Sequence, residues 1–309
     1  MNNVLYSTVP LDRAHDLRRD AQTQESLRRS PEKQVVPYWR ELSLVAEANA
    51  ILAHGTQAAE LLDLAREIVF LGKDGEDRPV FAADISDLAG EADGSGPNLG
   101  LSGTWQGLRG IGALLPPGEA ALLGYARALL IWHRRARFCG TCGAPTESRD
   151  GGHVRQCLDT TCNTQSHPRT DPAVIMRVTD RDSILLHRQP NWPAGQWSVL
   201  AGFVEPGETL EEAVSREVRE ETGILVADIA YGGSQPWPFP SSIMIAFSAR
   251  AVGGTLTPCP HELEDARWFT RDTILAEFDE KHRGTGTGLF LPTKGSIAHR
   301  MIEDWLAAY

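Results

Sequence analysis

No long apolar run occurs in this sequence of 309 residues. A membrane-spanning helix needs about 18 consecutive apolar residues, and no stretch approaches that length. The first twenty residues carry too many charges for a secretory signal peptide. Together these absences predict a cytoplasmic protein without a membrane-embedded part.

Basic residues are also scarce, because 30 Lys and Arg stand against 41 Asp and Glu and give a net charge of −11. A broad nucleic-acid-binding surface needs a basic footprint, which this balance argues against. The balance is compatible with a pocket that holds only the terminal nucleotide of an RNA. The densest basic segment, Trp132–Arg137, is interpreted as a solvated helix end that the helix dipole favours.

Cysteine is rare as well, and four of the five cysteines lie within 24 positions: Cys139, Cys142, Cys157 and Cys162. Paired cysteines on Gly-rich turns can present four thiolates to Zn²⁺ and leave no position open for water, so the sequence predicts a structural zinc site. The second pair has a longer spacing than the first, which makes Cys162 the least secure ligand, with His153 or His167 as substitutes. A disulfide framework would need an oxidising compartment, for which the sequence carries no signal.

Acidic residues are abundant, and seven of them fall with three glycines in the 23 residues from Gly202 to Ile224. The Pro-Gly pair at Pro206 indicates a tight loop. Thr209 followed by Glu212 has the spacing of a capping box, so a helix is expected to begin there. Gly223 supplies the expected end of that helix.

Helical geometry separates the glutamates of this helix into two groups. At about 100° per residue, Glu217 and Glu221 share a sector with the apolar Leu210 and Val214, whereas Glu212 falls on the opposite side. An ionised carboxylate turned inward is costly unless a cation or hydrogen-bond donors meet it. Hard cations such as Mg²⁺ prefer carboxylate oxygens. Glu217 and Glu221 are therefore candidates for metal binding.

The same segment resembles the Nudix box, G-x5-E-x7-R-E-U-x-E-E-x-G-U with U a bulky aliphatic residue, at every defined position. The matching residues are Gly202, Glu208, Arg216, Glu217, Val218, Glu220, Glu221, Gly223 and Ile224. Nudix enzymes hydrolyse phosphoanhydride bonds of nucleoside diphosphate derivatives with Mg²⁺ or Mn²⁺. The resemblance therefore implies a metal-dependent hydrolase, and a motif of this length is far more specific than a lone glycine motif.

The resemblance also implies roles for individual residues. Arg216 would orient a glutamate by ion pairing, and Glu220 would bind metal or position water. Glu221 would assist the deprotonation of a water whose pKa the cations lower while they offset the charge of the diphosphate. The metal ligands implied in this way are Glu217, Glu220, Glu221, Glu262 and the carbonyl of Ala201.

A proline-aromatic segment, Ser234-Gln-Pro-Trp-Pro-Phe-Pro-Ser-Ser242, lies ten residues beyond the box. Its prolines deny the backbone amide donors, so it cannot form a central strand. Its two rings fit either a stacking surface for a flat ligand or an edge loop whose rings cover a core. The order of residues is similar to the array of the NADH pyrophosphatase subfamily, which also removes NAD caps from RNA 5′ ends. By this resemblance the nicotinamide-nucleotide site is lined by Phe203, Gln235, Pro236, Trp237, Pro238, Phe239, Pro240, Ser241, Ser242 and the backbone of Ala298, while His167 replaces an aromatic residue of the subfamily.

The expected fold class is α/β, with an α/β/α Nudix sandwich preceded by a Nudix-like domain and a small zinc ribbon. The expected domains are a non-catalytic N-terminal Nudix-like domain over 1–137, the ribbon over 138–168 and the catalytic Nudix domain over 169–309. No second Nudix box occurs in the N-terminal part. Helices are expected over 119–137 and 295–309, and a hairpin of strands over 173–188.

Three functions remain open at this point. The first is hydrolysis of NADH or NAD⁺ to nicotinamide mononucleotide and AMP, together with cleavage of NAD-capped RNA. The second is a non-catalytic ligand sensor built from the zinc ribbon and the Nudix domain, which the intact glutamates disfavour. The third is a Nudix hydrolase of other nucleoside diphosphate derivatives such as ADP-ribose or coenzyme A. The subfamily resemblance also implies a homodimer.

Overall fold

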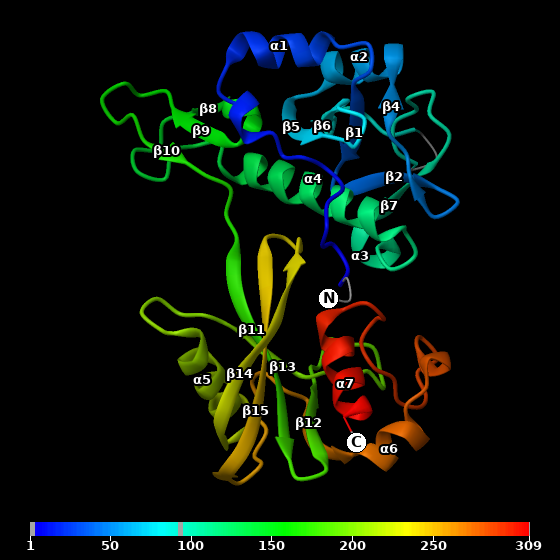
Figure 1. Ribbon diagram of the computed structural model, residues 1–309, viewed down its shortest axis with the longest axis vertical. Helices are drawn as coiled ribbons and strands as arrows, with labels where there is room; N and C mark the ends of the chain where they lie inside the picture. Colours follow the sequence, from blue (N-terminus) through cyan, green and yellow to red (C-terminus); the bar gives the residue numbers. More distant parts are fainter. Residues whose placement is uncertain (1–3, 92–94, 309) are drawn as a thin grey trace. The chain divides into compact units, whose positions relative to one another are not determined.

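The computed structural model in Figure 1 describes residues 4–91 and 95–308. The chain divides into two units, which we call the C-terminal unit and the N-terminal unit. Of the described residues, the C-terminal unit contains Val4, 171–236 and 242–308, and the N-terminal unit contains the rest of 5–170 and Trp237–Ser241. The zinc ribbon therefore belongs to the N-terminal unit. Position 309, the end of the expected terminal helix, lies outside the described residues.

Strands of the C-terminal unit form a six-stranded sheet in the order β14-β15-β11-β12-β16, with β13 paired to β11. β11 and β12 make the expected hairpin, and β15 runs parallel to β11 on its other side. In chain order the elements are β11 (Asp171–Asp180), β12 (Ser183–Arg188), β13 (Leu200–Phe203), α5 (Leu210–Thr222), β14 (Ile224–Trp237), β15 (Ser242–Gly254), β16 (Asp265–Thr270), α6 (Arg271–Glu277), the 3₁₀ helix η3 (Glu280–His282) and α7 (Ile297–Ala307).

Helices cover both faces of this sheet, because successive residues of a strand point to opposite sides. Ile175 of β11 packs in one cluster with Ile302 of α7. Its neighbour Val174 packs in a second cluster with Val214 of α5. Figure 1 shows α5 in yellow-green and α7 in red on opposite sides of the strands. The expected α/β/α sandwich is confirmed for this unit.

Helix α5 begins and ends where the sequence predicts. The Thr209 side chain accepts a hydrogen bond from the Glu212 backbone N–H at 3.2 Å, and the Glu212 carboxylate accepts one from the Thr209 N–H at 2.8 Å. At the other end Gly223 has φ 74°, a left-handed conformation that glycine adopts without a steric penalty. The caps at both ends therefore set which residues of the helix face the sheet.

Strands of the N-terminal unit form a second sheet in the order β3-β2-β1-β6-β5, with β4 paired to β1 and β7 to β2. The expected helix over 119–137 is observed as α4, shifted by two residues at each end. None of the helices among the described residues is long and apolar enough to cross a membrane. In chain order the elements are η1 (His15–Leu17), α1 (Ala21–Arg29), β1 (Gln34–Trp39), β2 (Leu42–Ala46), β3 (Asn49–Ala50), β4 (Ala53–His54), α2 (Gly55–Leu64), β5 (Glu67–Lys73), β6 (Pro79–Asp84), β7 (Thr104–Gly107), α3 (Leu108–Ile111) and α4 (Pro117–Arg135).

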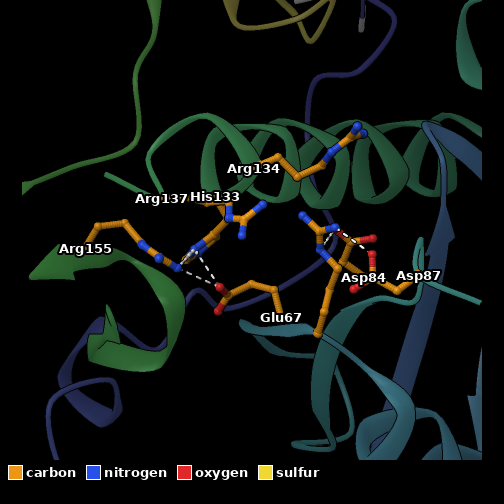
Figure 2. Close-up of a pocket in the computed structure, with 8 residues that line it drawn as sticks. Glu67, Asp84, Asp87, His133, Arg134, Arg137 and Arg155 are labelled. Carbon is orange, nitrogen blue, oxygen red and sulfur yellow. Dashed lines mark hydrogen bonds and ion pairs between the residues drawn. The ribbon is translucent and has the colours of Figure 1, made fainter. Parts of the chain in front are cut away.

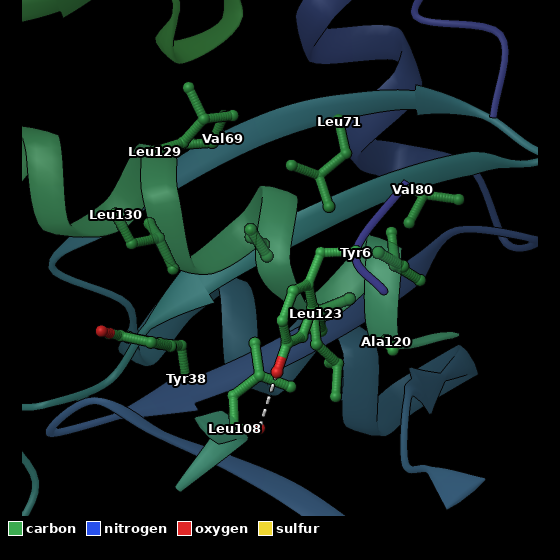
Figure 3. Close-up of a cluster of buried hydrophobic side chains, with 14 of the residues drawn as sticks. Tyr6, Tyr38, Val69, Leu71, Val80, Leu108, Ala120, Leu123, Leu129 and Leu130 are labelled. Atoms are coloured by element: carbon green, nitrogen blue, oxygen red, sulfur yellow. Dashed lines mark hydrogen bonds between the residues drawn. The ribbon is translucent and has the colours of Figure 1, made fainter. Parts of the chain in front are cut away.

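The second sheet also has two covered faces. On one face Val69 and Leu71 of β5 pack against Leu123 and Leu130 of α4, as Figure 3 shows. On the other face Phe70, which lies between these two strand residues, packs in a cluster that includes Leu61 of α2. The N-terminal unit is thus also a sheet between two helical layers.

The zinc ribbon is a three-stranded sheet in the order β10-β9-β8. Its strands are β8 (Thr146–Arg149), β9 (Val154–Cys157) and β10 (Gln165–Ser166), and the 3₁₀ helix η2 (Asp150–Gly152) joins the first two. Gly152 lies against β5, where a Cβ atom would approach Cγ2 of Val69 to 2.9 Å. An imidazole nitrogen of His153 lies 2.9 Å from the Phe70 carbonyl oxygen. His153 therefore fastens the ribbon to the sheet.

Candidate functional site

Helix α5 turns two of its glutamates toward the sheet. The Glu217 side chain is 12% exposed and Glu221 is 3% exposed, whereas the Glu220 side chain is 53% exposed. These values confirm the inward orientation that helical geometry predicts for Glu217 and Glu221. Glu220 lies at the edge of the same face, where it can reach a water or a ligand from the solvent side.

Strand β13 lies directly against the Glu217 carboxylate. A Cβ atom placed on Gly202 would overlap that carboxylate, so only glycine fits at this position. Ala201 precedes Gly202 on the same strand and pairs with Ile175 of β11. The first glycine of the box is therefore required for the close approach of a helix side chain to the strand that carries Ala201.

Arg216 holds three of the glutamates in place. Its guanidinium pairs with Glu208, with Glu217 at 3.0 Å and with Glu220 at 3.1 Å. It also donates a hydrogen bond to the Phe203 carbonyl at 2.9 Å. The bond from Arg216 lowers the pKa of Glu208 to about 2, and these partners raise the pKa of Arg216 itself. Arg216 thus joins the loop, the strand and the helix of the box.

A loop after β15 brings Glu262 toward these glutamates. The Cys259 backbone N–H donates to the Glu221 carbonyl at 2.8 Å, which satisfies an acceptor at the end of α5. Two residues after Glu262, Glu264 pairs with Arg188 at 2.7 Å and fixes the far side of the loop. Cys259 is the one cysteine outside the cluster of four in the sequence, and no pattern in the sequence reveals its backbone bond.

The electrostatics of Glu221 reflect this crowding. Burial raises its pKa to about 8, and the carboxylates of Glu217 and Glu262 add to the shift. Burial also raises the pKa of Glu217, although Arg216 opposes that shift. Among the described residues, Oε2 of Glu221 is buried and has no hydrogen-bond partner. A buried carboxylate oxygen without a donor is costly, so its surroundings must supply a positive partner.

A divalent cation fits this requirement. Carboxylate and carbonyl oxygens are the ligands that Mg²⁺ and Mn²⁺ prefer. Glu217, Glu221 and Glu262 interact electrostatically with one another, and a cation among them would offset their mutual repulsion. The donor set of the box is therefore suited to the divalent metal that Nudix hydrolases use.

The four cysteines of the ribbon come together as a second metal-binding group. Their sulfur atoms all lie within 4.8 Å of one another. Cys139 and Cys162 are 3.8 Å apart, and Cys142 and Cys157 are 3.5 Å apart. Cys162 therefore joins the group in spite of its longer spacing. This arrangement fits a structural Zn²⁺ with four thiolate ligands.

The residues predicted to bind the nicotinamide nucleotide lie in different places, and the structure joins two of them, Gln235 and Ala298. Gln235 is fully buried, and its side-chain oxygen accepts a hydrogen bond of 2.8 Å from the Ile297 backbone N–H. This bond places Gln235 beside the first turn of α7, which contains Ala298. Phe203 is 61% exposed and leaves its ring accessible at the end of β13. His167 is exposed and lies outside the strands of the ribbon.

The two rings of the proline-aromatic segment belong to the N-terminal unit. Trp237 and Phe239 are partly buried and pack against the cluster that contains Tyr6. The plainer of the two interpretations from sequence, rings that cover a core, is thus observed for both residues. Their proposed contact with a nicotinamide nucleotide stays a prediction.

A cavity of about 410 Å³ lies between the end of α4 and the ribbon, inside the N-terminal unit. Figure 2 shows Arg155 and His133 directed toward Glu67, at 2.7 and 3.3 Å. Asp84 pairs with Arg66 at 3.1 Å. The carboxylates of Glu67 and Asp84 in this cavity are therefore already in ion pairs, and the pair of Arg155 with Glu67 links the ribbon to the sheet. Arg137 lines the cavity mouth, so the basic segment 132–137 is not wholly solvated.

Comparisons with known families agree along the chain. The NUDIX domain matches residues 169–286. The NADH pyrophosphatase-like rudimentary NUDIX domain matches residues 32–132, and the NADH pyrophosphatase zinc ribbon domain matches residues 134–166. The three matches follow one another in the order expected from the sequence.

Curated relatives carry related names. The NAD-capped RNA hydrolase NudC of Stutzerimonas stutzeri is 41% identical over 234 residues, which cover 76% of this chain and 75% of that protein. The human NAD-capped RNA hydrolase NUDT12 is 44% identical over 196 residues, covering 61% of this chain. The match spans 42% of the human protein, less than half its length. A solved NUDIX hydrolase from Nitrosomonas europaea, 23% identical, covers 50% of this chain and 97% of that chain with a TM-score of 0.39.

Proposed function

Because the chain belongs to the Nudix hydrolase family, in the group of NADH pyrophosphatases and NAD-capped RNA hydrolases, we propose that it hydrolyses the diphosphate of NAD(H). The products are nicotinamide mononucleotide and AMP, and with NAD-capped RNA the same cut releases nicotinamide mononucleotide from the 5′ end. The metal-dependent part of this proposal is supported by Glu221. One of its carboxylate oxygens is buried without a hydrogen-bond partner among the described residues, and Glu217 and Glu262 lie nearby. The choice of NAD(H) and NAD-capped RNA as substrates is supported by the names of the relatives.

The residues of the box divide the chemical work. Divalent cations, when bound, offset the charge of the diphosphate and lower the pKa of a water. Glu217, Glu221, Glu262 and the Ala201 carbonyl would hold these cations, and Glu221 would assist removal of the water proton. Glu220 positions that water from the exposed side of the helix. The water oxygen bonds to phosphorus, the bridging P–O bond breaks, and the leaving phosphate oxygen keeps the electron pair.

Arg216 keeps this arrangement rigid. Its pairs with Glu208, Glu217 and Glu220 fix both ends of the glutamate cluster before substrate binds. A prealigned cluster needs little reorganisation when charge moves toward the leaving oxygen. Phe203, whose ring is exposed at the end of the strand beside Glu217, stacks on the nicotinamide side of the substrate.

A direct comparison of substrates tests this function. NADH, NAD⁺, ADP-ribose and NAD-capped RNA are offered separately with Mg²⁺ and with Mn²⁺, and the products are resolved by chromatography. We expect AMP from both free dinucleotides, with nicotinamide mononucleotide from NAD⁺ and its reduced form from NADH. From the capped RNA we expect nicotinamide mononucleotide and a 5′-monophosphate RNA. No cleavage of any nicotinamide substrate with either metal would sink the assignment. Cleavage of ADP-ribose alone would point instead to a hydrolase of other nucleoside diphosphate derivatives.

Two further properties stay predictions, the homodimer from the family resemblance and the cytoplasmic location from the sequence. We expect a homodimer, which light scattering after size-exclusion chromatography measures directly. A monomer at micromolar concentration contradicts this expectation without bearing on the reaction. The cytoplasmic location stays a prediction from the sequence.

A further inference from the structure

Five residues of the proline-aromatic segment, Trp237–Ser241, belong to the N-terminal unit, although the chain on either side belongs to the C-terminal unit. Gln235 and Pro236 precede them and Ser242 follows. The chain thus leaves the unit that carries the Nudix box for five residues and then returns to it. The contacts of these five residues decide where the two ends of the segment can lie.

Arg127 of α4 provides the central polar contact. This side chain is 8% exposed, and its Nη1 donates a hydrogen bond of 2.5 Å to the Pro238 carbonyl. Its Nη2 pairs with Glu41 at 2.6 Å, which fixes the guanidinium from the other side. The same guanidinium lies 5.1 Å from the centre of the Phe239 ring. One buried arginine therefore holds two consecutive residues of the segment.

Aromatic contacts hold the neighbouring residues. The ring of Tyr6 lies 5.4 Å from that of Phe239 and 6.1 Å from that of Trp237, both edge to face. The Arg109 guanidinium lies 4.8 Å from the Phe239 ring centre, within the range of a cation–π contact. The Tyr6 hydroxyl donates to the Leu108 carbonyl at 3.3 Å, and burial raises its pKa to about 12. Tyr6 is thus fixed in the core and is a firm support for both rings.

Helix α4 approaches the segment closely at a glycine. A Cβ atom on Gly124 would lie 3.2 Å from Cγ of Pro238 and 3.4 Å from Cδ1 of Tyr6. Pro238 is buried at this contact. Gly124 therefore sets the depth at which the segment lies on the helix.

The segment is stiff enough to pass a displacement to its ends. Pro236, Pro238 and Pro240 each have a fixed φ, so fewer backbone rotations are left to absorb a shift at the middle proline. Gln235 is itself held by the Ile297 backbone N–H at 2.8 Å. Through these covalent neighbours, we expect a change in the position of Pro238 to act on Gln235 or Ser242, the residues predicted at the nicotinamide nucleotide.

We propose that the N-terminal unit positions the substrate-recognition segment, with Arg127 and the close contact at Gly124 as its positioning elements. This role rests on the proposed function, because the segment matters only if it binds the nicotinamide nucleotide. Arg127 acts through Pro238 and does not itself touch the substrate. The domain without a Nudix box thus controls affinity for the dinucleotide, while the glutamates of α5 control the rate of the cut.

Gly124→Ala is the sharpest test, because it pushes on Pro238 while alanine favours the helix. We expect the KM for NADH to rise about tenfold with kcat changed less than about twofold, since only ground-state binding is altered. Hydrogen exchange of the fragment that contains Trp237–Ser241 should become faster. Gly118→Ala is the matched control. Gly118 lies in the same helix, α4, and its added Cβ would lie 3.3 Å from Cγ of Pro10, which is outside the segment. We expect this control to leave both readouts unchanged.

Arg127→Gln removes the polar contact without adding bulk. We expect the same rise in KM, and partial rescue by Arg127→Lys, which keeps a charged donor for the Pro238 carbonyl. Arg13→Gln is the control, because the exposed Arg13 makes a cation–π contact at 4.1 Å with Tyr125 and not with the segment. If Arg127→Gln fails to fold, Gly124→Ala still decides the question.

The outcomes separate this role from the proposed function. A wild-type protein that does not cleave NADH removes the function, and the positioning role falls with it. A wild-type protein that cleaves NADH, with KM unchanged in both Gly124→Ala and Arg127→Gln, overturns the positioning role alone. An equal rise of KM in Gly118→Ala overturns it as well, because the effect would then not depend on the segment.

Discussion

The two sheets of this protein are connected in the same way, yet only one of them carries the glutamate cluster. In the C-terminal unit the central strand β11 pairs with β12, β13 and, in parallel, β15. In the N-terminal unit the central strand β1 pairs with β2, β4 and, in parallel, β6. In both, a helix follows the short third partner: α5 follows β13, and α2 follows β4.

The difference between the units lies in the buried faces of these two helices. On α2 the buried residues are Ala58, Leu61 and Leu62, and the acidic Glu60 is exposed. On α5 the buried face includes Glu221 among its valines. The shared connection therefore provides a position for a helix next to the central strands, and in α5 the carboxylates on the inner face suit that position to the proposed metal site.

Replacing the inward carboxylate should have the largest effect. We expect Glu221→Gln to lower kcat by about a thousandfold, because it weakens the metal site and removes the assisting base. Circular dichroism and zinc content should match the wild type. Glu60→Gln on α2 is the control, and we expect it to retain full activity. Normal turnover by Glu221→Gln would remove this residue from the mechanism.

Filling the space beneath Glu217 should have the next largest effect. Gly202→Ala would force the carboxylate away from β13, and a displacement of about 1 Å can cost a hundredfold in rate. We expect kcat to fall about a hundredfold while the protein stays folded. Gly253→Ala, whose Cβ would meet only Leu225 at 3.9 Å, serves as the control. Equal activity in both variants contradicts the need for a glycine at this position.

Loss of the structural zinc should lower the thermal stability of the N-terminal unit and leave that of the C-terminal unit unchanged. We expect Cys162→Ser to lower zinc content and to lower the melting temperature of the N-terminal unit by about 5–10 °C, because metal binding stabilises a ribbon of this size. Melting of the C-terminal unit should stay within about 2 °C of the wild type. Calorimetry with metal analysis measures both, and Cys259→Ser, outside the zinc group, should change neither. Full zinc occupancy in Cys162→Ser would show that another residue takes its place.

Lowering the pH should reduce the free energy of unfolding of both units, and this is the smallest of the expected effects. Burial lowers the pKa of His153 in the N-terminal unit and of His187 in the C-terminal unit to about 4. Between pH 6.5 and 4 the unfolded chain binds protons at these positions that the folded chain does not, so stability falls with falling pH. The slope is at most about 1.4 kcal/mol per pH unit for each histidine. Urea unfolding from pH 7 to 5 measures it, and His153→Gln or His187→Gln should each reduce it.

The glutamate helix could be predicted from sequence because its signals are local. The capping residues Thr209 and Glu212, the terminal Gly223 and the spacing of Glu217 and Glu221 all act within one helix. The zinc group was predictable for a similar reason, since its cysteines lie close together in the chain. Cys162 remained open because a spacing does not show how a turn folds back.

Contacts between distant residues could not be predicted in this way. The approach of Glu262 depends on a backbone bond from Cys259 to the end of α5. The seat of Trp237 and Phe239 depends on Tyr6, Arg109 and Arg127, which lie more than a hundred positions away. A backbone donor or an arginine carries no residue pattern that identifies its partner.

The sequence by itself determined the order of the three family segments, the type of chemistry and which glutamates turn inward, because these depend on spacing along one element. The tertiary structure showed how Glu262, which the family resemblance implied, comes near the cluster and that Cys162 joins the zinc group. It alone decided that five residues of the proline-aromatic segment are held by the N-terminal unit. These depend on which surfaces meet after folding, where burial and shape select the partners.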